Sequence, residues 1–305
     1  MTDLPHTESP PVLVSGANGF TGRFVCLELL RRGLPLVALL RPGADPSWLA
    51  CRGIPVRYAD LQHSPSLAEQ LKGCHALLNV ASIGFGAAPA ILQACVIAGV
   101  QRVVFVSTTA IFTQLNADSK AVRQAAEAAI TASGLDTTIL RPTMIYGTAG
   151  DRNMIRLIAW LDRWPLLPIF GSGRAMQQPV HVRDVAWAVV QALETPESIG
   201  SQFNLSGAAP LTYNEVVRLA AQALGRRVHC LHLPVLPMLL LLRMAEHLGI
   251  RLPIKSEQIL RLNEDKVFTH DAAEAILGYA PIGFAEGIAQ EVALYRSGKS
   301  GLTCG

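Results

Sequence analysis

Short apolar runs alternate with helical patterns along the first half of the chain. The apolar runs predict strands at 12–14, 36–40, 56–59, 76–80, 103–106 and 137–140. The stretches between them predict helices at 23–30, 66–72, 88–98 and 119–133. Strands that are apolar at almost every position are typical of a parallel sheet with helices on both faces. With right-handed crossovers, this pattern predicts an α/β, doubly wound fold whose ligands bind beyond the carboxyl ends of the strands.

A glycine-rich turn joins the first predicted strand to the first predicted helix. Its glycines, Gly16, Gly19 and Gly22, are spaced three apart. Glycines let a backbone turn tightly and approach phosphates closely, and the helix start offers N–H groups and a positive dipole end. An ordinary glycine-rich turn is the less favoured interpretation, because the flanking strand and helix both fit. The turn therefore predicts a Rossmann-type site for a dinucleotide pyrophosphate, formed by Gly16, Asn18, Gly19, Phe20, Thr21, Gly22 and Arg23.

The character of the sequence changes after Gly147, where prolines divide the chain into short pieces. We expect a flexible N-terminus at 1–11, a dinucleotide-binding Rossmann core at 12–147 and a smaller, mixed C-terminal substrate lobe at 148–296. A helix at about 182–194 is expected to pack back on the core, and 297–305 is expected to be a tail.

Composition excludes several classes of function. Half of the 305 residues are hydrophobic and 16% are charged, as in a well-buried globular protein. The net charge of +3 is small and scattered, so no nucleic-acid partner is expected. The six cysteines form no CxxC pair and no cluster with histidines, which predicts no metal site and favours free thiols in a cytoplasmic protein. The apolar window from Leu231 to Leu242 is too short to span a bilayer; a buried helix is favoured over a peripheral membrane contact through 231–248.

Five further segments, in order, give the chain a resemblance to a known family. They are Tyr58-Ala59-Asp60-Leu61, Asn79-Val80-Ala81-Ser82, the run from Gly99 to Thr109, the run from Leu140 to Gly147, and the run from Pro179 to Ala186. With the glycine-rich turn, they resemble the extended and atypical short-chain dehydrogenases/reductases, the NAD(P)-dependent epimerase/dehydratase family. The resemblance implies that Asp60 and Leu61 face the adenine, that Asn79 and Ala81 lie near the middle of the cofactor, and that Ser107 and Pro142 lie towards the nicotinamide.

The end of the second strand bears on the choice of nicotinamide cofactor. An acid there usually holds the ribose 2′-hydroxyl of NAD(H), whereas a 2′-phosphate needs a cation. Arg41 stands at this position, and Arg23 follows the last glycine of the turn. These two residues favour NADP(H) over NAD(H), although Asp45 leaves NAD(H) open as an alternative.

The catalytic residues of the family are incomplete in this sequence. The resemblance implies a Tyr-x-x-x-Lys pair beside a serine or threonine, with the tyrosine exchanging the substrate proton. Thr109 fits the threonine and Lys120 fits the lysine, but Asn116 occupies the tyrosine position. Asparagine is no acid or base near neutral pH. Tyr146 is the nearest replacement, although a structural role is favoured for it.

Three functions follow from this resemblance. The leading hypothesis is an NAD(P)(H)-binding oxidoreductase of the epimerase/dehydratase type that acts on a nucleotide-sugar or a related hydroxyl or ketone substrate. The second is a non-catalytic NADP(H)-binding structural or regulatory protein, as with an accessory subunit of respiratory complex I. The third is a reductase or dehydrogenase for a lipid-like substrate such as a sterol or isoprenoid. Alanine-rich helices at 87–98 and 121–132 would allow a homodimer.

Overall fold

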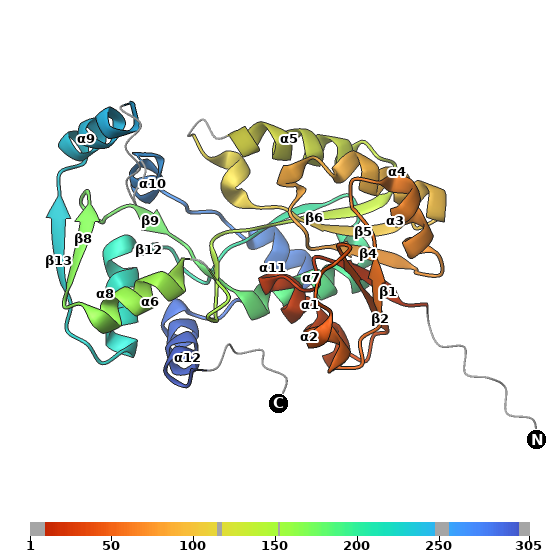
Figure 1. Cartoon of the computed structure of the whole chain (residues 1–305), viewed down its shortest axis with the longest axis horizontal. Helices are drawn as coiled ribbons and strands as arrows, with labels where there is room; N and C mark the ends of the chain where they lie inside the picture. The colour runs from red at the N-terminus through yellow and green to blue at the C-terminus, as the bar shows by residue number, and fades with distance from the viewer. Residues whose placement is uncertain (1–9, 115–117, 152, 248–255, 299–305) are drawn as a thin grey trace, which may run out of the picture.

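A parallel sheet of seven strands forms the centre of the larger part of the molecule (Figure 1). The computed structural model describes residues 10–114, 118–151, 153–247 and 256–298. The strand order is β11-β6-β5-β4-β1-β2-β3. The bounds are β1 Val12–Ser15, β2 Leu36–Leu40, β3 Val56–Tyr58, β4 Ala76–Asn79, β5 Arg102–Val106, β6 Asp136–Pro142 and β11 Gln202–Leu205. This order, with all pairs parallel, confirms the predicted doubly wound sheet.

Helices cover both faces of the sheet, because alternate strand residues point to opposite sides. Val12 and Val14 pack in one apolar cluster and Leu13 packs in the other. The first cluster lies under α1 Phe20–Arg31, α2 Ser47–Ala50, α7 Val182–Glu194 and α11 Asp271–Leu277. The second lies under α3 Ser64–Leu71, α4 Ala88–Ala98 and α5 Asp118–Thr131. Two buried faces explain why the strands are apolar at nearly every position.

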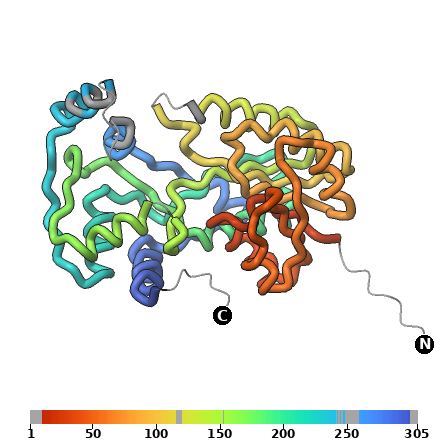
Figure 2. The backbone as a smooth tube through the Cα atoms, viewed as in Figure 1, coloured from red at the N-terminus to blue at the C-terminus, as the bar shows by residue number. Residues whose placement is uncertain are grey.

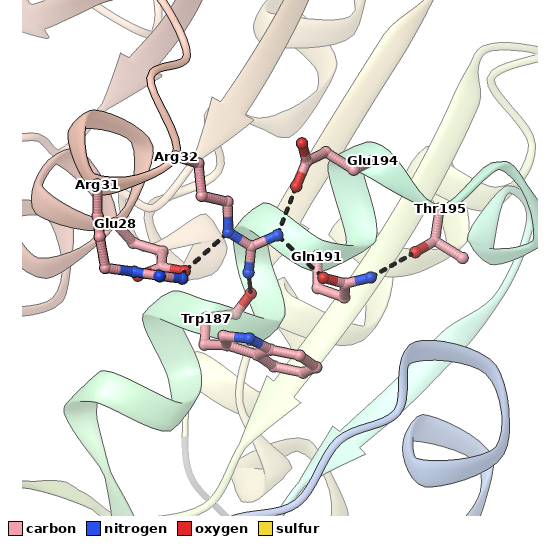
Figure 3. A network of polar contacts seen from close by, with 7 residues as sticks. All are labelled: Glu28, Arg31, Arg32, Trp187, Gln191, Glu194 and Thr195. Carbon is pink, nitrogen blue, oxygen red and sulfur yellow. Dashed lines mark hydrogen bonds and ion pairs between the residues drawn. The ribbon is translucent and has the colours of Figure 1, made fainter.

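Three later segments return to the sheet after the chain has left it (Figure 2). Helix α7 packs along α1, as the sequence predicts for 182–194. Arg32, the C-cap of α1, joins the two helices by donating to Gln191 at 2.9 Å and pairing with Glu194 (Figure 3). Strand β11, which the apolar pattern did not identify, pairs with β6 as the seventh strand. Helix α11 packs against β11 and α7.

The second part of the molecule has an apolar core of its own. Small two-stranded sheets join β7 Ile145–Tyr146 to β10 Val180–His181, β9 Met176–Gln177 to β12 Leu211–Thr212, and β8 Leu166–Phe170 to β13 His229–Leu233. The helices are α6 Met154–Arg163, α8 Tyr213–Ala223, α9 Val235–His247, α10 Ser256–Leu262 and α12 Phe284–Arg296. Short 3-10 turns lie at Ile83–Phe85, Thr109–Phe112 and Pro196–Ser198.

Two sequence expectations concern membrane spans and cysteines. Among the described residues, no helix combines the length and the apolar character needed to cross a bilayer. Cys26, Cys74, Cys95 and Cys230 are free thiols, but Cys51 is disulfide-bonded. The expectation of free thiols is therefore wrong for Cys51.

Candidate active site

The residues proposed for the cofactor gather along one edge of the central sheet. The registers place Ser15 beside Leu39 and Asn79, and Phe105 beside both Asn79 and Ile139. Since the strands are parallel, their carboxyl ends meet at this edge. The residues that end or follow these strands are Gly16, Arg41, Asp60, Ala81, Ser107 and Pro142.

The glycine-rich turn is shaped for a close approach of the backbone to a ligand. Gly16 has a φ of +68°, and a Cβ there would lie 2.7 Å from the backbone nitrogen of Ala81. A Cβ at Gly22 would lie 2.0 Å from the carbonyl oxygen of Gly16. Helix α1 begins after Gly19, and no side chain caps this start. The N–H groups of the first turn therefore receive no acceptor from the side chain of the N-cap residue. An uncapped helix start beside a tight turn fits the diphosphate of a dinucleotide.

A cationic cluster lies beside this turn. Arg23 donates to the side-chain oxygen of Asn18 at 2.7 Å, and its guanidinium lies 5.0 Å from the centre of the Trp48 ring. The guanidinium of Arg52 lies 4.1 Å from the same ring. Partial burial lowers the pKa of Arg23, and the charge of Arg52 lowers it further. Arg23 and Arg52 therefore repel one another, and a bound anion would relieve that repulsion.

The sequence identified only part of this cluster. Arg41 follows β2 as predicted and is exposed to solvent. Trp48 and Arg52 were missed, because they lie in and after the short helix α2, to which no motif pointed. Asn18 also donates to the carbonyl of Asp45 at 2.7 Å, so the asparagine connects the turn to the loop after β2.

Residues near the middle of the proposed cofactor mostly position the backbone. Asn79 accepts from the Ser15 hydroxyl at 2.6 Å and donates to the carbonyl of Ala81 at 3.0 Å. Its side chain is buried, so it holds Ala81 against the glycine-rich turn. Asp60 accepts from the backbone N–H of Gln62 at 2.9 Å, and Leu61 packs against the core.

Ser107 belongs to a buried polar network behind the site. Its hydroxyl donates to Glu127 at 2.5 Å, and Arg141 donates to the same carboxylate at 3.0 Å. The guanidinium of Arg141 also lies 5.2 Å from the centre of the Phe112 ring. Thr109 is buried, and its hydroxyl donates to the carbonyl of Pro142 at 3.4 Å. Ser107 and Thr109 both line the cleft described below.

Lys120 is held by a loop that the second part of the molecule anchors. Its ammonium donates to the carbonyl of Thr113 at 2.6 Å. Glu264 accepts from the Thr113 hydroxyl at 2.8 Å and from the backbone N–H of Gln114 at 2.7 Å. Glu264 was missed by sequence reasoning, because only the fold brings it to this loop. Asn116, at the tyrosine position of the family, lies outside the described residues.

Tyr146 points away from this region. Its ring packs 5.1 Å from Phe284 and 5.3 Å from His181, between centroids. A Cβ at Gly287 of α12 would lie 2.1 Å from the tyrosine hydroxyl, so that hydroxyl fills the space above the glycine. Burial raises the pKa of Tyr146. The geometry gives no support to Tyr146 as a replacement acid. His181 is the N-cap of α7, and its Nδ1 accepts from the backbone N–H of Arg183 at 3.3 Å.

A cleft of about 1240 Å³ lies between the sheet edge and the second part of the molecule. Its sheet side carries the hydroxyl groups of Thr21, Ser82, Ser107, Thr108, Thr109 and Thr143 together with apolar side chains such as Val80, Ile83 and Val106. The opposite wall has both apolar and polar side chains, and the apolar ones include Met154, Leu157, Phe170, Val216, Ile259, Leu262, Val267 and Phe268. The polar and charged ones include Arg156, Gln177, Glu264, Asp265 and Lys266. Such a cleft suits a small-molecule ligand that has both apolar and polar parts.

Comparisons with known proteins agree with this geometry. The chain matches the family described as NAD(P)H-binding over residues 16–196. It is 28% identical over 236 residues to the ceramide reductase of Caulobacter vibrioides, which covers 73% of each chain. It is 25% identical over 281 residues to the mitochondrial NADH dehydrogenase (ubiquinone) 1 alpha subcomplex subunit 9 of Arabidopsis thaliana, covering 85% of this chain and 69% of the relative.

The fold has the same kind of counterpart among solved structures. The UDP-glucose 4-epimerase from Thermotoga maritima superposes with a TM-score of 0.75 at 17% identity, covering 94% of this chain and 99% of that one. The match to the family extends over more than half of the chain and includes the glycine-rich turn and β2 to β6. The chain therefore belongs to the NAD(P)H-binding family and has the fold of the epimerase/dehydratase enzymes.

Proposed function

We propose that the protein is an NADP(H)-dependent reductase of a ketone carried on a lipid-like substrate. The observation that carries this proposal is the cleft, which joins the hydroxyl groups of the sheet edge to the apolar side chains of the opposite wall. The similarity to a ceramide reductase supports a long apolar substrate. The apolar side chains in the cleft favour an apolar substrate, because each Å² of apolar surface that binding removes from water contributes about 25 cal/mol.

The preference for NADP(H) is proposed from the cationic cluster. Arg23 and Arg52, on the Trp48 ring, would hold the 2′-phosphate, with Arg41 nearby at the end of β2. A hydrogen bond to a charged group contributes about 1.5–3 kcal/mol. Arg52→Ala is therefore expected to weaken NADPH binding roughly tenfold or more and to leave NADH binding unchanged.

Fluorescence titration of the purified protein with each dinucleotide measures this preference. Arg218→Ala, an exposed change on α8, is the matched control and should alter neither affinity. Equal affinity of the wild type for NADPH and NADH would refute the proposed preference. An equal loss of both affinities in Arg52→Ala would do the same.

The proposed catalytic residues are Thr109 and Lys120. The dinucleotide, when bound, supplies the hydride. We propose that the Thr109 hydroxyl binds the carbonyl oxygen, since it is buried and lines the cleft. Lys120, held at Thr113, would supply a positive charge near that oxygen. Because Tyr146 is turned away, water in the cleft is the proposed proton source.

Turnover of 3-oxoacyl lipids and sterol ketones with NADPH, and of UDP-sugars with NADP⁺, tests the reaction. We expect oxidation of NADPH with a lipid ketone, and a loss of kcat in Thr109→Val and in Lys120→Met. Turnover of UDP-sugars alone would favour the second candidate, a nucleotide-sugar enzyme, for which Arg156 and Lys266 in the cleft provide cations for a diphosphate. If NADPH binds but no substrate is reduced, the proposed reductase is wrong and the non-catalytic alternative is supported.

A further inference from the structure

One end of the second part of the molecule carries exposed apolar side chains that the proposed reaction does not use. Helix α9 follows β13 directly along this end (Figure 1). Leu236, Leu240 and Met244 of α9 are 74%, 69% and 59% exposed. Their spacing of four residues places them on one face of the helix. An exposed stripe of large apolar residues is unusual for a helix whose function is only to fill a core.

The opposite face of the same helix packs against the protein. Leu239 and Leu242 are buried and pack with Ile259 of α10. Phe170, at the end of β8, packs against this cluster. Among its described side chains, helix α9 is therefore apolar on two sides, one turned to the protein and one turned outward.

Exposed apolar side chains also lie on β13, which leads into α9, and on its partner strand β8. Leu231 of β13 and Leu166 of β8 are each 47% exposed, and the two strands pair in parallel. Trp164, two residues before Leu166, is also exposed. We call these six exposed side chains the apolar edge: Trp164, Leu166, Leu231, Leu236, Leu240 and Met244.

The surroundings of the apolar edge are basic. Arg163 stacks on Trp164 with its guanidinium 5.4 Å from the ring centre, and it is exposed. Arg227 and His229, four and two residues before Leu231, are exposed as well. Asp162, the acid beside them, is paired with Arg226 at 3.3 Å. Tryptophan and leucine flanked by arginine are the residues that bind a membrane–water interface, where basic side chains meet anionic headgroups.

We propose that the apolar edge docks this protein on the surface of an anionic lipid bilayer, with the α9 stripe inserted among the acyl chains. The basic surroundings favour a lipid surface over a second copy of the chain, because like charges would face one another across a symmetric interface. Docking would also place the cleft beside the bilayer, since Phe170 and Ile259 line the cleft and pack against the inner face of α9. The proposal requires no catalytic turnover and goes beyond the proposed reaction.

Vesicle flotation tests the docking surface without any assay of activity. We expect the wild type to float with vesicles of phosphatidylcholine and phosphatidylglycerol, and to float less at high salt, which screens the basic residues. The exposed double change Leu236→Ser and Leu240→Ser should weaken binding roughly thirtyfold, which corresponds to about 2 kcal/mol at about 1.4 kcal/mol per factor of ten. The control, Val96→Ser with Ile97→Ser, removes a comparably exposed apolar pair from α4 and should float like the wild type.

Two further measurements separate docking from misfolding and from self-association. Trp164→Ser should also weaken flotation, and circular dichroism should show that all variants keep the wild-type fold. A wild type that remains unbound with these vesicles would overturn the proposal, as would a Leu236/Leu240 double variant that floats as well as the wild type. If the wild type is a dimer that the double variant alone dissociates, with no vesicle binding, the apolar edge is an interface between copies and the lipid proposal is wrong.

Discussion

A buried carboxyl pair predicts an unusual dependence of stability on pH. Glu291 of α12 is fully buried, and its Oε2 accepts from the backbone N–H of Gly147 at 3.0 Å. Asp151 caps α6, accepting from the N–H of Met154 at 2.8 Å. Oε1 of Glu291 and Oδ2 of Asp151 have no conventional donor among the described residues. Burial, followed by the Asp151 carboxyl, raises the pKa of Glu291 to about 10. We infer that Glu291 is protonated near neutral pH and donates this proton to Asp151.

The sign of the effect follows from this raised pKa. The unfolded chain releases the Glu291 proton near its usual pKa of about 4.3, whereas the folded protein keeps it up to about pH 10. Between these values the folded state binds one more proton than the unfolded state. The free energy of unfolding then falls as pH rises, by up to about 1.4 kcal/mol per pH unit. The stabilisation is fully present below about pH 4.3 and lost by the time the folded group ionises.

Glu291→Gln isolates this contribution. The amide keeps the shape, accepts from Gly147 and donates to Asp151 without a titrating proton. Relative to the wild type, its stability should therefore rise by up to about 1.4 kcal/mol between pH 7 and pH 8. Urea unfolding at the two pH values measures the difference. This range avoids His181, whose pKa burial lowers to about 4, and Asp184, whose pKa burial raises to about 6.

Glu286→Gln, an exposed change on the same helix, is the control and should keep the wild-type slope. A wild type whose stability is constant or rises over this range would refute the shared proton. The same conclusion would follow if Glu291→Gln retained the slope of the wild type.

Two other substitutions test the core packing. Arg32→Ala should lower the free energy of unfolding by about 1–3 kcal/mol, because it leaves partners on α1 and α7 unsatisfied (Figure 3). The control is Arg31→Ala, which removes only an exposed ion pair with the same Glu28 and should lower the free energy of unfolding by well under half as much. Similar melting temperatures for the two variants would contradict the proposed link between the helices. Glu127→Ala should lower the free energy of unfolding by about 3–5 kcal/mol, because it leaves the nearly buried guanidinium of Arg141 without its carboxylate partner. Chemical denaturation measures this loss, and a change under about 1 kcal/mol would show that the pair is not needed.

Almost every residue of β1, β2, β4 and β5 is apolar, because both faces of these strands are buried, and β3 and β6 contain shorter apolar runs. These six strands could therefore be predicted from local sequence. The seventh could not. In β11 only Phe203 and Leu205 are buried, and Gln202 at its start is exposed, so the strand has too little apolar sequence to be recognised before it pairs with β6.

The candidate site divides in the same way. The glycine-rich turn was found because its chemistry resides in consecutive residues, between a strand and a helix that are themselves recognisable. Arg52 beside Arg23, and Glu264 beside the loop that holds Lys120, depend on segments brought together from different parts of the chain. The orientation of Tyr146 also depends on α12, whose Phe284 packs against the tyrosine ring although it lies 138 residues later in the chain.

The sequence by itself determined the sheet, the turn at its edge and the kind of cofactor, since these follow from periodicity and from backbone space at adjacent positions. Tertiary structure alone decided which cations lie beside the turn, which side chains line the cleft, and which apolar face of α9 remains in solvent. Those features arise from contacts between segments distant in the chain, and no local pattern records which distant segment a side chain will meet.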